Sequence, residues 1–338
     1  MNLKETLGVD TMVAMPPLPS ILTHTVRAPE VTARIEEMSW WYTPAWTGDR
    51  LPRLNVANWE QVLIPSYLQW FGNAGFLNIK QKAFQFQRWC NGSTEAIQGI
   101  INWIAEYSST KTVYVLAGDY AGYWFRAKTL ESSLVIRTVP RNQNPHNLPP
   151  GFVFISSPSA YDGALVSKEL LSAWGSKHHI ILDGVYAGMS QEVLDVTHPA
   201  IFAYVTSLSK PFGGFVWRSG LILAKENIPM LTENTDFKGV PGMAYAESLV
   251  NNVSLGVHFS ELRTLQTMAL RRIEKRTGYR LDPAPVSLLA TLSPESEQAL
   301  RLEQEFPEDA SRFLRDAGGG KSIYRFSLGP AIAAVLYS

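Results

Sequence analysis

The sequence has 338 residues, and 30 lysine and arginine residues balance 30 aspartate and glutamate residues, so the formal net charge is zero. This balance gives no electrostatic reason to expect a nucleic-acid partner or a membrane-surface partner. Hydrophobic residues make up 46% of the chain, and the length allows one large domain and a smaller one. No apolar stretch is long enough to span a bilayer, and the N-terminus lacks the features of an export signal, so we expect a cytoplasmic protein.

Residues 1–50 are rich in proline and threonine and predict an N-terminal arm, with a possible short helix near Val31–Met38. Aromatic side chains are concentrated in the first quarter of the chain: Trp40, Trp41, Tyr42, Trp46, Trp59, Tyr67, Trp70, Phe71 and Phe76. They predict packing of the arm onto the body of the protein. An oligomer interface or an apolar pocket would use the same residue types.

Over residues 51–245, short apolar segments alternate with segments of helical periodicity. The predicted strands are Thr112–Leu116, Ser133–Val139, Phe152–Ser156, Ile180–Leu182, Ile201–Val205 and Gly220–Ala224. The predicted helices are 94–107, one from about Tyr120, and Lys168–Trp174. This alternation is typical of an α/β domain in which a mostly parallel sheet carries helices on both faces.

Residues 246–338 have a different pattern, which predicts a smaller α+β domain. A long helix is expected over Leu262–Thr277, followed by a proline-rich turn at 283–285. A strand near Val286–Thr291, a helix around Glu297–Phe306 and a final strand at Ile323–Ser327 complete this domain.

Functional groups follow two of the predicted strands. Asp183 ends the segment beginning at Ile180, with Tyr186 three residues later, and Ser207, Lys210 and Arg218 follow the next strand. A carboxylate at such a position can keep a pyridine nitrogen protonated, and a lysine can form a Schiff base and then move protons. In isolation Asp183 would be read as a helix cap or a turn residue. Together, in this order, the residues predict a site that holds pyridoxal phosphate.

The segment Gly92-Ser93-Thr94 stands at the start of the predicted helix 94–107. Free backbone N–H groups, two hydroxyls and the positive end of the helix dipole would hold a phosphate there. Small polar residues also cap many helices, so the segment alone is a weak signal. Ser207 and the Arg218 guanidinium would share the same phosphate.

These motifs resemble those of fold-type I pyridoxal-phosphate enzymes of the class I/II aminotransferase family. Asp183-Gly184-Val185-Tyr186 resembles the family's Asp-x-x-Tyr strand, and Ser207-Leu208-Ser209-Lys210 followed by Arg218 resembles its lysine motif. The resemblance runs from about residue 90 to 225 and resumes near the C-terminus. It implies a large domain built on a seven-stranded type of sheet, and a homodimer whose active sites lie at the subunit interface.

The resemblance also implies two further roles. Tyr120, at the end of Val115–Tyr120, matches the aromatic residue that stacks on the cofactor ring. Arg325, in Ile323–Ser327, matches the arginine that binds the α-carboxylate of an amino-acid substrate. Catalytic roles fall to Lys210, Asp183 and Tyr186. The expected activity is that of a pyridoxal-phosphate-dependent aminotransferase that works through a Schiff base on Lys210.

One departure from the family bears on the reaction. Ala160 stands where the family has an asparagine whose side chain donates a hydrogen bond to the cofactor's phenolate oxygen. Loss of this donor should raise the pKa of the imine, unless Tyr161, Tyr186 or a water replaces it. A lyase, a cyclase or another non-transaminating amino-acid enzyme with the same cofactor is therefore the alternative. A regulatory protein that keeps the cofactor without turnover is a third reading, but residues 1–50 are too short and proline-rich for a DNA-binding domain.

Two other patterns predict no site. Ala317–Ser322 lacks the first glycine of a nucleotide-binding loop and has Arg315 in its place, so a flexible turn is expected. His178 and His179 point in opposite directions on a strand, and no third ligand is in view, so no metal is expected.

Overall fold

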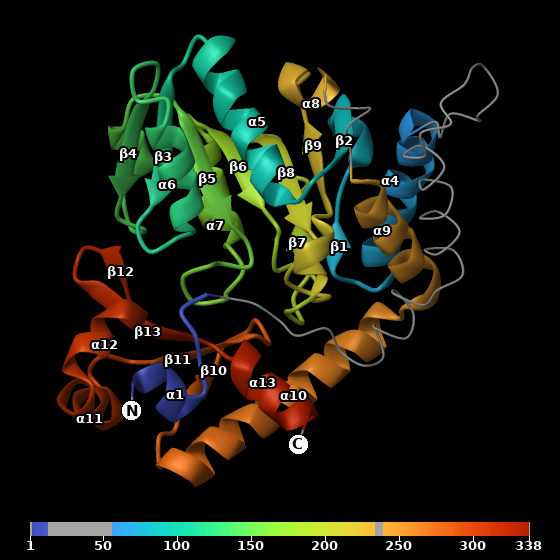
Figure 1. The fold of residues 1–338 in the computed structure, drawn as a ribbon. Coiled ribbons are helices and arrows are strands. Elements are labelled where there is room, and N and C mark those ends of the chain that lie inside the picture. The colour runs from blue at the N-terminus through green and yellow to red at the C-terminus, as the bar shows by residue number, and fades with distance from the viewer. Residues whose placement is uncertain (1, 13–55, 234–238, 338) are drawn as a thin grey trace, which may run out of the picture.

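The computed structural model of the chain describes residues 2–12, 56–233 and 239–337. The possible helix near Val31–Met38 and the aromatic residues from Trp40 to Trp46 lie outside the described residues. Figure 1 shows a large sheet with its helices above a smaller sheet with its own helices. The predicted domain boundaries stay a prediction; residue 245 lies inside helix α9 (Val240–Asn252).

The large sheet has seven strands in the order β2-β9-β8-β6-β5-β3-β4. Their bounds are β2 (Phe86–Cys90), β3 (Thr112–Leu116), β4 (Val135–Val139), β5 (Phe152–Ser156), β6 (His179–Asp183), β8 (Ile201–Ser207) and β9 (Gly220–Ala224). Strand β9 runs antiparallel to both of its neighbours, while β4, β3, β5, β6 and β8 pair in parallel. The prediction of a mostly parallel seven-stranded sheet is therefore confirmed. A separate parallel pair joins β1 (Leu77–Asn78) to β7 (Leu194–Asp195).

Helices cover both faces of the large sheet (Figure 1). One face carries α5 (Ser93–Glu106), α6 (Ala121–Lys128) and α8 (Pro229–Glu233); the other carries α4 (Val56–Asn73) and α7 (Lys168–Gly175). Each helix buries an apolar stripe on the alternating side chains of the strands, which accounts for the continuous apolar runs in β5 and β8. Aromatic rings of α4 pack on one another and on rings from β2 and from the loop after β8. The ring centroids of Tyr67 and Trp89 are 5.7 Å apart, and those of Trp70 and Phe212 are 5.4 Å apart.

The small sheet has four antiparallel strands in the order β10-β11-β13-β12. Its elements are β10 (Asp282–Pro283), β11 (Leu289–Leu292), β12 (Leu314–Gly318), β13 (Lys321–Ser327), α10 (Leu255–Thr277), α11 (Glu297–Glu305), α12 (Pro307–Phe313) and α13 (Gly329–Leu336). Helix α10 begins earlier than the predicted Leu262. The prediction began too late because a core-facing residue of the first turn is His258, a polar residue that apolar spacing does not reveal. His258 is buried, and its ring is hydrogen-bonded to the Pro211 carbonyl.

The N-terminal helix α1 (Leu3–Leu7) packs on the small sheet's side of the molecule. Leu3 and Leu7 are fully buried, and the Leu3 N–H donates to Asp309 at 3.1 Å. Beyond the helix, Asp10 forms a β-bridge with Ser327 of β13. Residues 11 and 12 are thereby held beside the edge of the large sheet where the functional side chains gather.

The turn between β12 and β13 rests on the loop that follows β4. Gly318, Gly319 and Gly320 all have positive φ, and a Cβ on Gly318 would lie 2.9 Å from Pro140. The Arg141 N–H donates to the Ala317 carbonyl at 2.9 Å. The predicted turn thus connects the two sheets, and it carries β12 and β13 to the edge of the large sheet.

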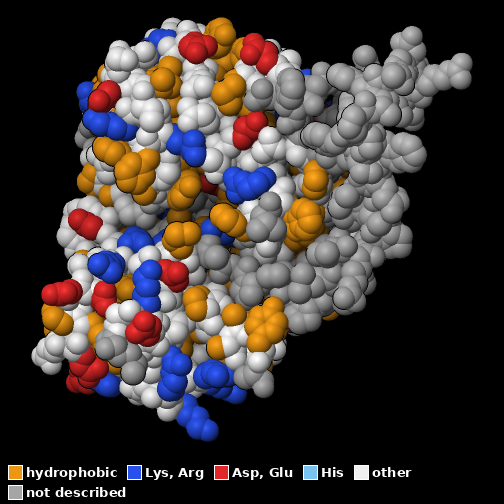
Figure 2. All heavy atoms as spheres, in the orientation of Figure 1, with side chains coloured by type: hydrophobic (Ala, Val, Ile, Leu, Met, Phe, Trp, Pro, Cys, Tyr) orange, Lys and Arg blue, Asp and Glu red, His pale blue; other side chains and the backbone are white. Residues whose placement is uncertain are grey.

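On the face that Figure 2 shows, acidic and basic side chains are interspersed over the described surface. None of the helices in the described ranges is long and apolar enough to cross a membrane.

Candidate active site

A cavity of about 790 Å³ opens at the carboxyl ends of the parallel strands, between the two sheets. Every site residue predicted from the sequence lines it except Gly92: Ser93, Thr94, Tyr120, Asp183, Tyr186, Ser207, Lys210, Arg218 and Arg325. The carboxyl ends of parallel strands share one edge of a sheet, so residues far apart in the chain converge there. The structure brings these residues together, and their individual roles stay predictions.

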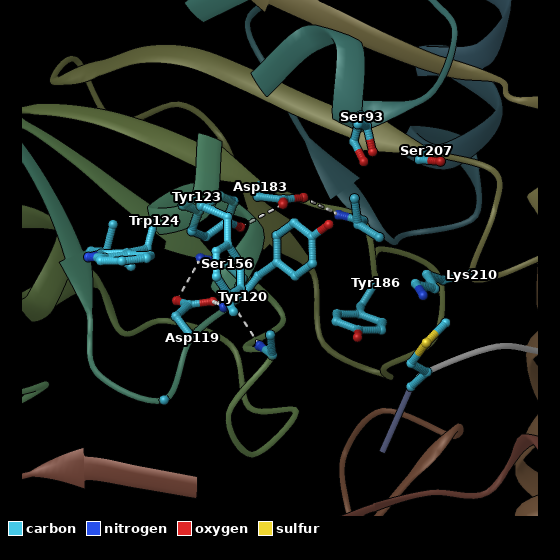
Figure 3. Close-up of a pocket in the computed structure, with 18 of the residues that line it drawn as sticks. Ser93, Asp119, Tyr120, Tyr123, Trp124, Ser156, Asp183, Tyr186, Ser207 and Lys210 are labelled. Atoms are coloured by element: carbon cyan, nitrogen blue, oxygen red, sulfur yellow. Dashed lines mark hydrogen bonds between the residues drawn. The ribbon is translucent and has the colours of Figure 1, made fainter. Parts of the chain in front are cut away.

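Asp183 is the last residue of β6 and is buried, and its carboxylate accepts two hydrogen bonds (Figure 3). The Tyr123 hydroxyl donates to Oδ2 at 2.6 Å, and the Val185 N–H donates to Oδ1 at 3.0 Å. Burial raises the pKa of Asp183 to about 6 despite these two donors, and the nearby charge of Asp119 raises it further. A cation facing this carboxylate would lower its pKa again and so favour the ionised form.

Lys210 follows the end of β8 and is largely enclosed by the cavity walls. Burial lowers the pKa of its amine to about 8, and the positive charges of Arg325 and Arg218 act in the same direction, while Asp183 opposes them. About half of the amine is therefore neutral near pH 8, and only a neutral amine is nucleophilic.

The N-terminus of α5 and the turn after Lys210 form an anion cradle. Gly92, the N-cap of α5, has φ of 84°, and a Cβ there would lie 2.9 Å from Nη2 of Arg218. The Arg218 guanidinium therefore packs directly on this glycine. Ser93 and Ser207 lie close together on the same side of the cavity (Figure 3). Backbone N–H groups, hydroxyls and a guanidinium at a helix N-terminus suit a phosphate group.

Two tyrosines on α6 lie next to each other at the cavity wall. Tyr120 is the N-cap of α6, and its ring folds back over Gly122, where a Cβ would lie 2.3 Å from the ring. Its ring meets that of Tyr123 edge to face, with centroids 5.2 Å apart. Tyr186 comes from the turn after β6, and burial raises its pKa to about 12, so its phenol stays protonated and can donate.

Arg325 on β13 is buried, and backbone carbonyls hold its guanidinium. Nη1 donates to the Ala160 carbonyl, and Nη2 donates to the Thr11 carbonyl at 3.1 Å. Its Nε has no hydrogen-bond partner among the residues that the structure describes. No carboxylate in the described ranges lies within ion-pair distance of Arg325. This buried cation can therefore accept an anionic ligand.

The sequence did not indicate three further residues of the cavity, Asp119, Tyr123 and Arg315. Tyr123 could have been noticed because it lies one helical turn after Tyr120. Arg315 lies on β12 opposite Ile323, so it shares a face of the hairpin with Arg325 and is its diagonal neighbour. Burial lowers the pKa of Arg315 to about 10, and the charge of Arg325 adds to this effect.

The donor set fits pyridoxal phosphate. Hydroxyls and a guanidinium that suit a phosphate lie at the α5 N-terminus. A buried carboxylate with a raised pKa and a lysine with a lowered pKa lie in the same cavity. The fold and this site define a pyridoxal-phosphate-dependent enzyme of fold type I. No group of three or more potential metal ligands occurs within the described part of the chain.

Comparison with known proteins shows a similarity to one family over part of the chain. The profile of the family "Aminotransferase class I and II" matches residues 136–270. No curated protein sequence matches the chain. The matched segment covers 135 of the 338 residues and contains Asp183, Lys210 and Arg218, so this part of the chain is similar to the class I and II aminotransferases.

Solved structures agree on the fold at low sequence identity. A pyridoxal-phosphate-bound putative aminotransferase from Clostridium difficile 630 is 14% identical, with a TM-score of 0.62 over 99% of this chain and 93% of that one. A putative histidinol-phosphate aminotransferase from Erwinia carotovora atroseptica is 13% identical, with a TM-score of 0.58 over 96% of both chains. L-threonine-O-3-phosphate decarboxylase from Porphyromonas gingivalis is 15% identical, with a TM-score of 0.52 over 84% of this chain and 96% of that one.

Proposed function

We propose that the chain removes the amino group of an amino acid with Lys210 as the attachment point of the cofactor and as the proton carrier. The observation that carries this proposal is the meeting of Lys210, Asp183 and Arg325 in one cavity. A nucleophilic amine, a carboxylate for a ring cation and a receptor for the α-carboxylate are the groups that the reaction requires.

The cofactor would be held at several points by this chain's own residues. Gly92, Ser93, Thr94, Ser207 and Arg218 would bind its phosphate. The ring would lie against Tyr120, with its nitrogen facing Asp183 and its phenolate oxygen facing Tyr186. When bound, pyridoxal phosphate supplies an electron sink for the bonds of the substrate's α-carbon.

The substrate would be positioned by Arg325 and acted on by Lys210. The Arg325 guanidinium would bind the α-carboxylate, since it lines the cavity and no carboxylate in the described ranges pairs with it. Lys210 Nζ would then take the proton from the α-carbon, which its lowered pKa of about 8 favours. The Tyr186 phenol would donate a hydrogen bond throughout, because its raised pKa keeps it protonated.

Arg315 supports a narrower substrate class, in which the amino acid carries a second anionic group on its side chain. Arg315 and Arg325 face the same cavity, and no carboxylate in the described ranges forms an ion pair with Arg315. Two neighbouring cations repel each other in a partly buried site, and a substrate with two anionic groups would neutralise both. Two of the similar structures carry names of phosphorylated substrates, histidinol phosphate and L-threonine O-3-phosphate, which agrees with this proposal.

The test is a half-reaction of the purified holoenzyme with single amino acids in the absence of a keto acid. We expect O-phospho-L-serine or L-glutamate to convert the visible spectrum of the lysine-bound cofactor to that of its amine form, with release of the matching keto acid. The Lys210→Ala variant should lack the visible band of the lysine-bound cofactor. A band that survives in this variant would contradict the role of Lys210.

The same experiment separates the alternative reactions. Ala160 in place of the family's asparagine, and the similarity to a decarboxylase, both favour testing them. Release of carbon dioxide with formation of an amine would indicate decarboxylation. Release of ammonia together with a keto acid, while the cofactor stays in its lysine-bound form, would indicate elimination.

We also propose a homodimer. Tyr120, Phe125 and Phe215 line the cavity, yet they are 45%, 64% and 55% exposed in the single chain. A cluster of exposed aromatic rings at the mouth of a site suits a subunit interface. Light scattering with size-exclusion chromatography should give twice the mass of the chain. The cytoplasmic location stays a prediction.

A further inference from the structure

The peptide groups on either side of Ala160 are hydrogen-bonded toward the active site, although its side chain is only a methyl group. Ala160 lies in the loop after β5, is 4% exposed, and lines the cavity. Its N–H donates to Ser156 Oγ at 2.7 Å, and its carbonyl accepts from Nη1 of Arg325. The backbone at this position therefore contacts the guanidinium that would bind the substrate's carboxylate.

Ser156 is in turn fixed by a buried carboxylate (Figure 3). Its hydroxyl donates to Oδ1 of Asp119, and its N–H donates to Oδ2 at 3.2 Å. The Asp119 side chain is fully buried, and Nη1 of Arg141 lies 3.7 Å away as the compensating charge. An ionised carboxylate only accepts hydrogen bonds, so it orients the single proton of the Ser156 hydroxyl toward itself. The lone pairs of Ser156 Oγ are then directed to the Ala160 N–H.

We propose that Ser156 and Asp119 are positioning residues for the substrate's α-carboxylate. Asp119 fixes Ser156, Ser156 fixes the backbone at Ala160 through its N–H, and the Ala160 carbonyl orients the guanidinium of Arg325. This inference rests on the proposed role of Arg325. The contacts to Ala160 and Thr11 hold Nη1 and Nη2, which leaves the second hydrogens of both Nη atoms for a ligand.

Ser156 is the better position for a test than Asp119. The Asp119 carboxylate also accepts the N–H of Tyr120 at 2.7 Å, so its replacement would disturb the ring-stacking residue as well. Ser157, the next residue in the chain, provides a matched control. Both serines are buried, but the Ser157 hydroxyl accepts from the Val166 N–H at 3.1 Å and does not line the cavity.

The experiment compares the wild-type holoenzyme with Ser156→Ala, Ser156→Thr and Ser157→Ala. The probes are O-phospho-L-serine and O-phosphoethanolamine, which has the same amine and phosphate but no α-carboxylate. In Ser156→Ala we expect the dissociation constant of O-phospho-L-serine to rise about tenfold, because one orienting hydrogen bond is lost. Binding of O-phosphoethanolamine should change less than about twofold. Ser156→Thr should restore most of the affinity, and Ser157→Ala should behave as the wild type.

Equal weakening of both probes in Ser156→Ala, or no weakening of either, would overturn the proposal. If Ser156→Ala does not fold, Ser156→Cys keeps the shape and weakens the hydrogen bonds, and the same comparison applies. If the wild type responds to neither probe, the proposed substrate class fails, and a crystal structure of the Ser156→Ala holoenzyme decides the inference. The Ala160 carbonyl should then have lost its contact with Arg325; an unchanged contact would overturn the positioning role of Ser156.

Discussion

The hydroxyl of Tyr123 donates a 2.6 Å hydrogen bond to Oδ2 of Asp183, and both buried side chains line the cavity. This hydrogen bond lowers the pKa of Asp183 against the effect of burial. Tyr123→Phe should therefore raise the pKa of Asp183, so that the acidic limb of the pH profile of kcat moves to higher pH. A charge-assisted hydrogen bond of about 1.5–3 kcal/mol predicts a loss of roughly tenfold or more in kcat near pH 7.

The control for this variant is Tyr114→Phe. Tyr114 is equally buried, and its hydroxyl donates to the Pro149 carbonyl at 2.8 Å, outside the cavity. Both variants should lose stability, but only Tyr123→Phe should shift the pH profile. The same profile in both variants would mean that Tyr123 is merely structural.

The lowered pKa of Lys210 predicts how the apoprotein takes up its cofactor. Neutral amine is the reactive form, and its fraction rises as the pH increases through about 8 rather than 10.5. The rate at which the visible band appears after addition of pyridoxal phosphate should rise from about pH 6.5 and level off above about pH 9. A rate that keeps rising through about pH 10 would contradict the lowered pKa.

Arg325→Met should move the midpoint of this pH dependence upward, because it removes a positive charge that disfavours protonated Lys210.

Gly92→Ala should weaken cofactor binding. The added Cβ would lie 2.9 Å from Nη2 of Arg218, so the guanidinium would have to leave its place beside the α5 N-terminus. We expect the dissociation constant of pyridoxal phosphate to rise about tenfold or more, as for a lost charge-assisted hydrogen bond. Gly75→Ala is the control, because Gly75 also has positive φ but a Cβ there would contact nothing within 4 Å. Equal cofactor affinity in both variants would exclude a specific effect on Arg218.

Arg315→Met should change substrate selection. The value of kcat/KM for an amino acid with an anionic side chain should fall about 10- to 100-fold, since the loss corresponds to one charge-assisted hydrogen bond. The value for L-alanine should change little. Arg312→Met is a suitable control, because Arg312 lies nearby on α12, is paired with Asp309 and does not line the cavity. If the two classes of substrate lose activity equally, Arg315 does not select for an anion.

Ala160→Asn should add a donor next to the cofactor's phenolate oxygen. The donor stabilises the phenolate and so favours the deprotonated linkage between Lys210 and the cofactor. The pKa of this linkage, measured by titration of the visible band, should fall by about one unit. Ala160→Leu fills the same space without a donor and should not lower that pKa. A lower pKa in both variants would point to crowding instead.

The parts of the site that could be predicted from the sequence are those at the ends of central strands. Asp183 and Lys210 follow short apolar segments, and parallel strands bring such positions to one edge, so their meeting needs no knowledge of side-chain packing. The long-range partners could not be predicted in this way. Tyr123 reaches Asp183, 60 residues away in the chain, only because α6 packs on the sheet beside β6.

The small sheet was harder to predict. Strand β12 (Leu314–Gly318) carries an arginine, an aspartate and a glycine in five residues, so it has no clean alternation, and Arg315 was seen only as a mismatch in a nucleotide-loop pattern. The contact between Arg325 and the Thr11 carbonyl spans 314 residues and depends on the bridge from Asp10 to β13. Such contacts follow from tertiary structure and leave no local signal.

The β12–β13 hairpin carries both Arg315 and Arg325, and its glycine turn is seated on Pro140 of the large sheet's loops. A ligand bound by both arginines would therefore link the two sheets. Its anionic groups would contact the hairpin of the small sheet, and its amine would face Lys210 beside the large sheet. Mechanical coupling between the sheets would then depend on occupancy of the site. Substrate binding should therefore slow the rates of proteolysis and of hydrogen exchange at the hairpin.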